Sequence, residues 1–232
     1  MVAAAVIANK NYGSSSGFLF GSFKKDLCGR WLVLAIVHPL LIFVASVAPL
    51  AFLGQPLDLA GLDWVQSLPL FPVMVFMNVW EEIGWRGYAL PKLQERRGGL
   101  VSGIIVGVFW SLWHWPHLVV KDSPMLANSG SVLLFVIMTT LNPLIFTAVY
   151  NLGRGNLLVP TFLHAAQNAW GIVVMIGLGV TTVGSFLLWV DVAVAVALVL
   201  AFGTDSLAPA RRARLSDIIE WHESNERLPE DS

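Results

Sequence analysis

Six long apolar stretches alternate with shorter polar stretches along the chain. An apolar run of about 20 residues is long enough to cross a lipid bilayer as a helix. The pattern predicts an all-α, polytopic membrane bundle of about six transmembrane helices, which we expect to form one domain over residues 31–203. The six runs occupy residues 31–53, 64–90, 100–120, 132–150, 157–179 and 183–202.

The two ends of the chain follow a different pattern. Met1–Ala8 is apolar but too short to span, and the rest of residues 1–30 mixes aromatic with basic residues, which is typical of a helix in the membrane surface. We interpret residues 1–30 as an N-terminal segment that combines an interfacial helix with the remnant of a truncated helix, whose beginning would lie upstream. Residues 204–232 are polar and predict a cytosolic tail with a helix over Leu207–Trp221.

Composition agrees with the membrane interpretation and restricts the classes of binding partner that we expect. The chain is 56% hydrophobic and 12% charged, with a mean hydropathy of +0.70, whereas soluble domains carry about 25% charged residues. The net charge of −1 gives no basis for a nucleic acid partner. Cys28 is the one cysteine, so the chain has neither an internal disulfide nor a CxxC metal site. We expect membrane lipid and a membrane-associated protein or peptide substrate as partners.

Basic residues between the apolar runs predict the orientation of the bundle. By the positive-inside rule, Lys and Arg gather in the cytosolic loops. The opposite loops contain only Lys121. This bias predicts a multi-pass protein of the cell membrane with both termini in the cytosol. The residues on the expected cytosolic side are Lys24, Lys25, Arg30, Lys92, Arg96, Arg97, Arg154, Arg211, Arg212 and Arg214.

Three ionisable residues interrupt the second apolar run. Glu81, Glu82 and Arg86 lie within six residues of one another, although one charged side chain at membrane depth costs about 2.5–3.5 kcal/mol on insertion scales. Glu82 and Arg86 have i,i+4 spacing and can form an ion pair on a helix, which would leave Glu81 free for chemistry. The alternative is a structural ion pair near the interface with a snorkelling Glu81.

Polar side chains in two later runs fall at a similar depth. At about 1.5 Å per helical residue, Glu81 lies roughly 16 Å, His114 roughly 21 Å and His164 with Asn168 roughly 10–17 Å from the cytosolic edge. His164 and Asn168 have i,i+4 spacing and share a helix face. We therefore expect one shared, buried polar cavity that opens to the cytosol.

Three short motifs carry a family resemblance. Glu81-Glu82-xxx-Arg86, Trp110-xxx-His114 and His164-xxx-Asn168 follow one another on successive predicted helices. In order and spacing they resemble the signature of the CAAX protease and bacteriocin-processing family, also called CPBP or Abi. The resemblance covers residues 64–170, with Trp110 where phenylalanine is common. The family's type II CAAX prenyl endopeptidases are intramembrane proteases that use a glutamate.

The resemblance implies roles for these residues. Glu81 and His114 would activate a water molecule, His164 and Asn168 would stabilise the oxyanion, and Glu82, Arg86 and Trp110 would support them, with no cofactor. A carboxylate in a low-dielectric cavity suits a general base near neutral pH, and imidazole and amide N–H groups are suitable oxyanion donors. The expected reaction is hydrolysis of a peptide bond in a membrane-associated substrate, a class that includes prenylated proteins.

Other functions remain open on the sequence alone. Glu81, His114 and His164 are a zinc-like ligand set, although the chain contains no HExxH motif. A non-catalytic scaffold or immunity protein of the same family is a second class, and a proton-relaying transporter is a third. Outside the motifs, we interpret His117 as structural, His38 as a hydrogen-bond donor at a kink before Pro39, and Asp191 as hydrogen-bonded within the bundle or lining water.

Overall fold

A computed structural model of the chain describes residues 22–23, 25, 29–54, 69–121, 123, 129, 131–177 and 183–226, without the side chains of 174–177, 183–188 and 226. Met1–Ala8, most of the expected interfacial helix and the start of the second apolar run at Trp64 lie outside these residues. All regular secondary structure in the described residues is helical, which confirms the all-α prediction.

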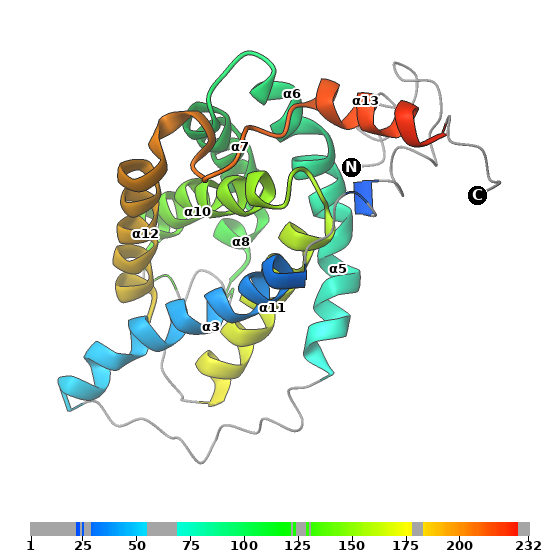
Figure 1. The fold of residues 1–232 in the computed structure, drawn as a ribbon. Helices are drawn as coiled ribbons and strands as arrows, with labels where there is room; N and C mark the ends of the chain where they lie inside the picture. Colours follow the sequence, from blue (N-terminus) through cyan, green and yellow to red (C-terminus); the bar gives the residue numbers. More distant parts are fainter. Residues whose placement is uncertain are drawn as a thin grey trace.

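The helices follow the six apolar runs, with a further helix in the tail (Figure 1). The second run forms a continuous helical segment, in which a π-helix separates two α-helices. In chain order, the elements are α3 (Gly29–Phe52), α5 (Leu70–Gly84), the π-helix η2 (Trp85–Ala89), α6 (Leu90–Gln94), α7 (Gly99–Trp113), α8 (Pro116–Val119), α10 (Val132–Leu152), α11 (Leu158–Gly177), α12 (Val183–Ser206) and α13 (Leu215–Glu226).

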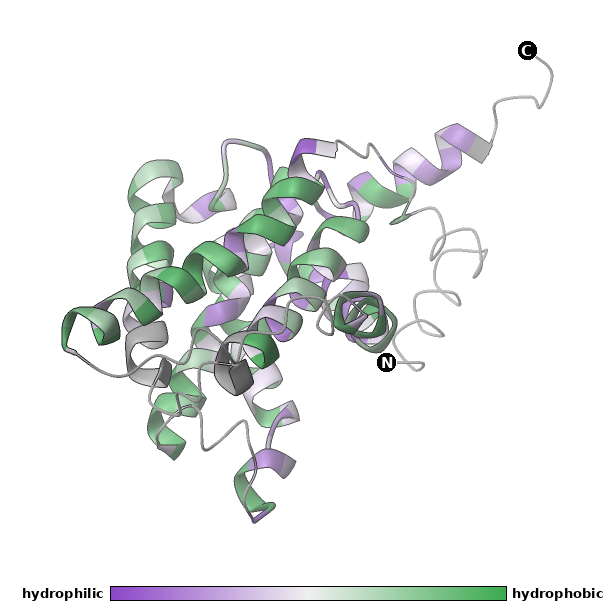
Figure 2. Ribbon diagram, turned by 90° about the horizontal axis from the view of Figure 1, so that it is seen from below, coloured by the Kyte–Doolittle hydropathy of each residue, from purple (hydrophilic) through white to green (hydrophobic). Residues whose placement is uncertain are grey.

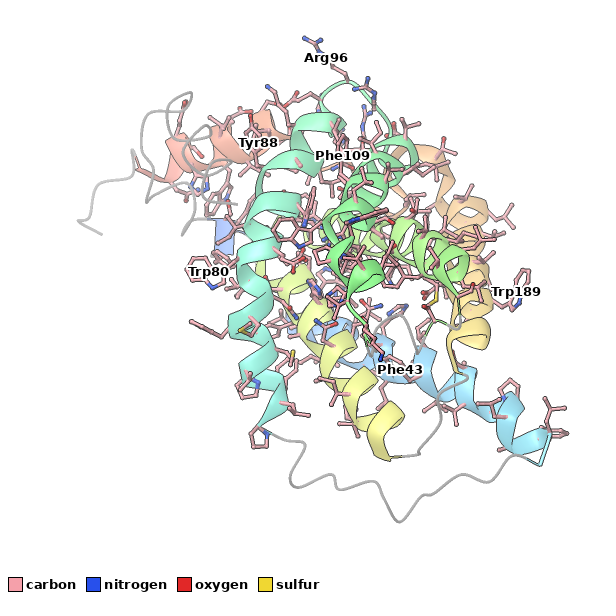
Figure 3. All side chains as sticks on the ribbon, turned by 180° about the vertical axis from the view of Figure 1, so that it is seen from behind. Phe43, Trp80, Tyr88, Arg96, Phe109 and Trp189 are labelled. Atoms are coloured by element: carbon pink, nitrogen blue, oxygen red, sulfur yellow. The ribbon has the colours of Figure 1, made fainter. Side chains whose placement is uncertain are left out.

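Three of these helices are long and apolar enough to cross a membrane. They are α3, α10 and residues 189–206 of α12, and α7 is a shorter apolar helix of 15 residues. Figure 2 shows that the helices of the bundle are apolar over most of their length. In Figure 3, Trp80 and Trp189 point away from the bundle on opposite sides. The chain is therefore an integral membrane protein with a helical bundle, and the count of six spans stays a prediction.

Three predicted boundaries are wrong. The second run was expected to end at Leu90, but the helix continues through α6 to Gln94. The third helix was expected to continue to Val120, but α7 ends at Trp113, and His114 caps it with non-helical ψ of 4°. Pro116 has no N–H to donate to the carbonyl of Leu112, so the chain turns here before the short helix α8. The tail helix begins at Leu215 rather than Leu207, because Leu207 has a φ of 57° and is fully buried.

Close packing of α7 against α10 brings the middle of the bundle together. α10 packs against α7 and α12, while α11 packs against α3 and α5. The approach of α7 depends on Gly107, where a Cβ atom would lie 2.0 Å from the carbonyl oxygen of Thr140. A side chain at this position would force the two helices apart. The glycine thereby keeps the end of α7, which carries His114, next to α10.

Among the described residues, several of the basic segments assigned to one side of the membrane are joined at one end of the bundle. Arg212 donates to the carbonyl of Arg97 at 2.7 Å, which joins the end of α12 to the turn after α6. At the same end, the Asn156 amide donates to the carbonyl of Lys25, and Lys25 lies over the ring of Trp221 in α13. Arg96 projects from this end in Figure 3. That this end faces the cytosol stays a prediction.

Candidate active site

A π-helix separates the glutamate pair from the rest of its helix. The backbone N–H of Trp85 lies between the carbonyls of Glu81 and Glu82, and the N–H of Leu90 reaches back to the carbonyl of Trp85. Such single-turn π segments occur frequently at functional sites because the extra residue re-aims the side chains that follow. Here Arg86 and Gly87 face the interior and are buried. No pattern in the sequence of residues 81–90 predicts this π-helix.

Glu82 is the centre of a fully buried ion pair. Its Oε1 accepts from Arg86 Nη1 at 3.0 Å and from His164 Nδ1 at 2.8 Å. Both Glu82 and Arg86 have 0% exposed side chains. The predicted pair between them is therefore confirmed. Since a carboxylate oxygen only accepts, the hydrogen of this contact resides on Nδ1 of His164.

Glu81 points to a different helix from its neighbour. Its Oε2 accepts a hydrogen bond from Trp110 Nε1 of α7 at 2.9 Å, and its side chain is only partly buried. The ring of Trp110 also meets the rings of His114 and His164 edge-on, at centroid distances of 4.9 and 5.5 Å. Trp110 thus contacts three of the residues that the motifs singled out.

His114 is held in one orientation at the end of α7. Its Nδ1 lies 2.7 Å from the carbonyl oxygen of Trp110 and is buried with the rest of the side chain. A carbonyl only accepts, so Nδ1 carries the hydrogen and Nε2 of the neutral ring keeps its lone pair. His117 stacks against His114 at 5.9 Å and contacts Ser123 through Nδ1 at 3.3 Å, in keeping with a structural role.

Asn168 is joined to α5 by Asn78, a residue that lies outside the three sequence motifs. Its Nδ2 donates to Oδ1 of the buried Asn78 at 3.2 Å. Asn78 precedes Glu82 by four residues and therefore lies on the same face of α5. A lone amide in an apolar run, at helical spacing from the glutamates, was the signal that could have identified it.

Aromatic rings stabilise the buried arginine. The guanidinium carbon of Arg86 lies 4.1 Å from the ring centroid of Phe146 and 5.5 Å from that of Trp110. A cation over an aromatic face gains about 2 kcal/mol or more when it is desolvated. Phe146, on α10, had no sequence signal that separated it from other core residues.

The zinc alternative does not fit the side chains as they lie. In the part of the chain that the structure describes, no group of three His, Cys, Asp or Glu side chains is arranged to hold an ion. Within the set considered from the sequence, Glu81 bonds to Trp110 and His164 bonds to Glu82. The structure thus brings Glu81 and His114 around Trp110, and His164 onto Glu82, without assembling them as ligands.

Comparisons with known proteins find a similarity over the part of the chain that carries the motifs. Residues 63–170 match the family of type II CAAX prenyl endopeptidases described as Rce1-like, and every motif residue falls in that range. The chain is also 41% identical over 56 residues to CAAX prenyl protease 2 of Methanococcus maripaludis. That match covers 24% of this chain and 21% of the relative, so it spans about a fifth of the relative's length. Residues 63–170, slightly less than half of the chain, are therefore similar to the Rce1-like type II CAAX prenyl endopeptidases.

Proposed function

We propose that the chain is an intramembrane endopeptidase of the CAAX prenyl protease type, which hydrolyses a peptide bond in a membrane-associated substrate. The family match and the protease name of the archaeal relative support this class of reaction. Prenylated proteins are the substrate class that the family description names, and membrane lipid is the expected surrounding.

This proposal rests on the different hydrogen-bond partners of two adjacent carboxylates, Glu81 and Glu82. Glu82 is committed to Arg86 and His164, whereas Glu81 takes one hydrogen bond from Trp110 through a single oxygen. Glu82 Oε2 also lacks a partner but is fully buried, whereas the Glu81 side chain is only partly buried, so Glu81 is the carboxylate that water can reach. A purely structural role for both acids gives no reason for this difference.

Glu81 and His114 act on the attacking water in this mechanism. Glu81 accepts a proton from water as the water oxygen bonds to the scissile carbonyl carbon. The free Nε2 of His114 accepts and relays protons, because its Nδ1 is occupied by the carbonyl of Trp110. When the tetrahedral intermediate collapses, the carbon–nitrogen bond breaks and the departing amine takes up the proton that Glu81 accepted from water.

His164 and Asn168 stabilise the oxyanion that forms in between. One N–H of Asn168 is given to Asn78, and the second is left for the oxyanion. His164 can donate from Nε2 only as an imidazolium, since Nδ1–H already faces Glu82, and the carboxylate of Glu82 supports that positive charge. Each such donor contributes about 2.7–4 kcal/mol to the transition state.

Cleavage by purified protein in proteoliposomes tests the proposal. A prenylated CAAX peptide and its unprenylated counterpart serve as substrates, and Glu81→Gln is compared with wild type. We expect Glu81→Gln to lose about 10²–10⁴-fold in rate while its unfolding temperature stays unchanged, because the amide keeps the shape but accepts no proton. Wild-type rates in the variant would disprove the assignment, and cleavage of neither peptide would argue for a non-catalytic member of the family.

The same assay tests whether the mechanism needs a metal. We propose that it does not, since asparagine is not a usual zinc ligand and Arg86 would repel a dication. Chelator treatment, followed by metal analysis of the protein, should then leave the cleavage rate unchanged. Stoichiometric zinc, with activity lost on its removal and regained on its return, would overturn this part of the proposal.

A further inference from the structure

A second polar cluster lies in the bundle away from the glutamates. His38 of α3, Asn142 of α10, Gln167 of α11 and Asp191 of α12 line one small cavity. Each comes from a different helix, and these helices pack in turn: α11 against α3, α3 against α12, and α12 against α10. Phe146 separates the two sites, since it lines the cavity and also packs against His164 at 5.5 Å.

Two buried oxygens in this cavity have no donor. Asn142 Nδ2 reaches Asp191 Oδ2 at 3.5 Å, which is long for a hydrogen bond. Asp191 Oδ1 and Asn142 Oδ1 accept from no described group, although the two residues are 2% and 7% exposed. His38 was expected to donate at its proline kink, yet its Nδ1 is also unpaired in the described structure. Buried acceptors without a donor are costly, so this set of groups calls for a partner.

The charge of Asp191 indicates what kind of partner fits. None of the ion pairs in the described part of the chain includes Asp191. An unpaired carboxylate inside a membrane bundle is expensive, and a neutral water would leave its charge in place. A proton on Asp191 would remove the charge, but it would leave the cavity beside the carboxylate empty. The cavity leaves about 10 Å³ for the centre of a water-sized particle, which is room for one small ion.

The donor set selects the class of ion. One carboxylate, two amide carbonyls and one imidazole form a mostly oxygen site with a single negative charge. Hard cations prefer such ligands, and a monovalent one leaves the site neutral, whereas a divalent one would leave a buried positive charge. We propose that His38, Asn142, Gln167 and Asp191 bind one small monovalent cation, such as Na⁺, that ties α3, α10, α11 and α12 together.

The site bears on the glutamate centre through α11. Gln167 lies between His164 and Asn168 in sequence, so a cation held by Gln167 fixes the helix that carries both. Cation binding is nevertheless a property of the fold and does not depend on peptidase activity. Its test uses the whole protein and requires no substrate.

Equilibrium binding of radioactive ²²Na⁺ to the purified protein in detergent measures the site directly. We expect saturable binding of about one ion per chain at a fixed pH of 8. Choline chloride keeps the ionic strength constant as the Na⁺ concentration is varied. Thermal unfolding in sodium chloride and in choline chloride of equal ionic strength should differ. At tenfold the dissociation constant, Na⁺ should raise the unfolding temperature by about 3–6 °C.

Matched variants locate the ion. Asp191→Asn and Gln167→Leu should lose the binding and the sodium-dependent shift. Asp205→Asn should keep both, because Asp205 lies on the same helix but has a 72% exposed side chain. If the wild-type protein binds no ²²Na⁺, or if its unfolding temperature responds to pH alone, the cation proposal is wrong. A proton on Asp191 would then explain the cavity. Sodium binding retained in both Asp191→Asn and Gln167→Leu would disprove the site. If one of these variants does not fold, binding by the other variant still tests the proposal.

Discussion

Two buried polar regions of the bundle differ in how completely their hydrogen bonds are satisfied. Near the basic end, the side chains of Gln94 and Asn151 are fully buried and bond to each other in both directions, at 3.1 and 2.9 Å. Gln94 also donates to the carbonyl of Ala213, and Asn151 donates to the carbonyl of Ser206 and accepts from the N–H of Ala213. Every donor and acceptor of this amide pair has a partner.

The glutamate centre is equally buried but incompletely paired. Among the described residues, Glu82 Oε2, Arg86 Nε and Nη2, and Asn78 Nδ2 have no hydrogen-bond partner. Unpaired buried groups are few in native proteins and are expected where chemistry takes place. Burial of polar side chains is thus common to both regions, and spare hydrogen-bonding capacity separates the glutamate centre, like the cavity lined by Asn142 and Asp191, from the amide pair.

This difference predicts that Glu82→Gln affects both stability and activity. The change removes the counter-charge of Arg86, which is fully buried, and breaking such a pair costs about 3–5 kcal/mol in unfolding free energy. Thermal unfolding in detergent and peptide cleavage are measured together. The double variant Glu82→Gln/Arg86→Met is the control, because it removes the stranded charge. We expect it to regain most of the stability but none of the activity; equal stabilities of the single and double variants would contradict the ion-pair argument.

The sequence predicted the parts of this picture that depend on periodicity and spacing. The apolar runs located α3, α10, α11 and α12, and the i,i+4 spacing identified the Glu82–Arg86 pair. The motifs also brought Trp110 into the group that the structure joins to Glu81. These features are local, so one helix turn or one apolar run is enough to reveal them.

Contacts between distant helices could not be predicted from the same information. The bond between Glu82 and His164 joins residues 82 apart in sequence, and the Asn78–Asn168 bond joins residues 90 apart. Gln94 lies between Lys92 and Arg96, which were expected on the cytosolic side, yet its side chain is fully buried. The π-helix after Gly84 and the end of α7 at Trp113 depend on tertiary packing and on the turn before Pro116.

Asn168→Leu should break the proposed catalytic region without unfolding it. Leucine fills the volume but offers no N–H to the oxyanion, and loss of such a donor costs about 2.7–4 kcal/mol, or about 10²–10³-fold in kcat. KM should stay near the wild-type value, because the contact forms in the transition state. Steady-state cleavage kinetics provide both constants. A kcat within about threefold of the wild-type value would remove Asn168 from the mechanism.

Gln94→Leu should have the opposite profile. It deprives Asn151 and the carbonyl of Ala213 of partners in a fully buried place, which should lower the unfolding free energy by about 1–3 kcal/mol. Because the amide pair lies outside the glutamate centre, kcat per folded molecule should remain that of wild type. Unfolding curves and active-fraction-corrected rates measure the two effects. A large fall in kcat with intact stability would mean that the two regions are coupled rather than distinct.

The smallest expected effect belongs to Asn78, which lies at the edge of the glutamate centre. Its Oδ1 accepts from Asn168, while its own Nδ2 is buried and unpaired in the described structure. Asn78→Leu removes one hydrogen bond, worth about 1 kcal/mol, and with it the contact that fixes the Asn168 amide, so kcat should fall about 5-fold. Stability should change little or rise, because the same substitution also removes an unpaired buried donor. Combining Asn78→Leu with Asn168→Leu should lower kcat no further than Asn168→Leu alone, since Asn78 acts only by positioning Asn168. Additive losses in this double-mutant cycle would instead give Asn78 a contact of its own with the substrate.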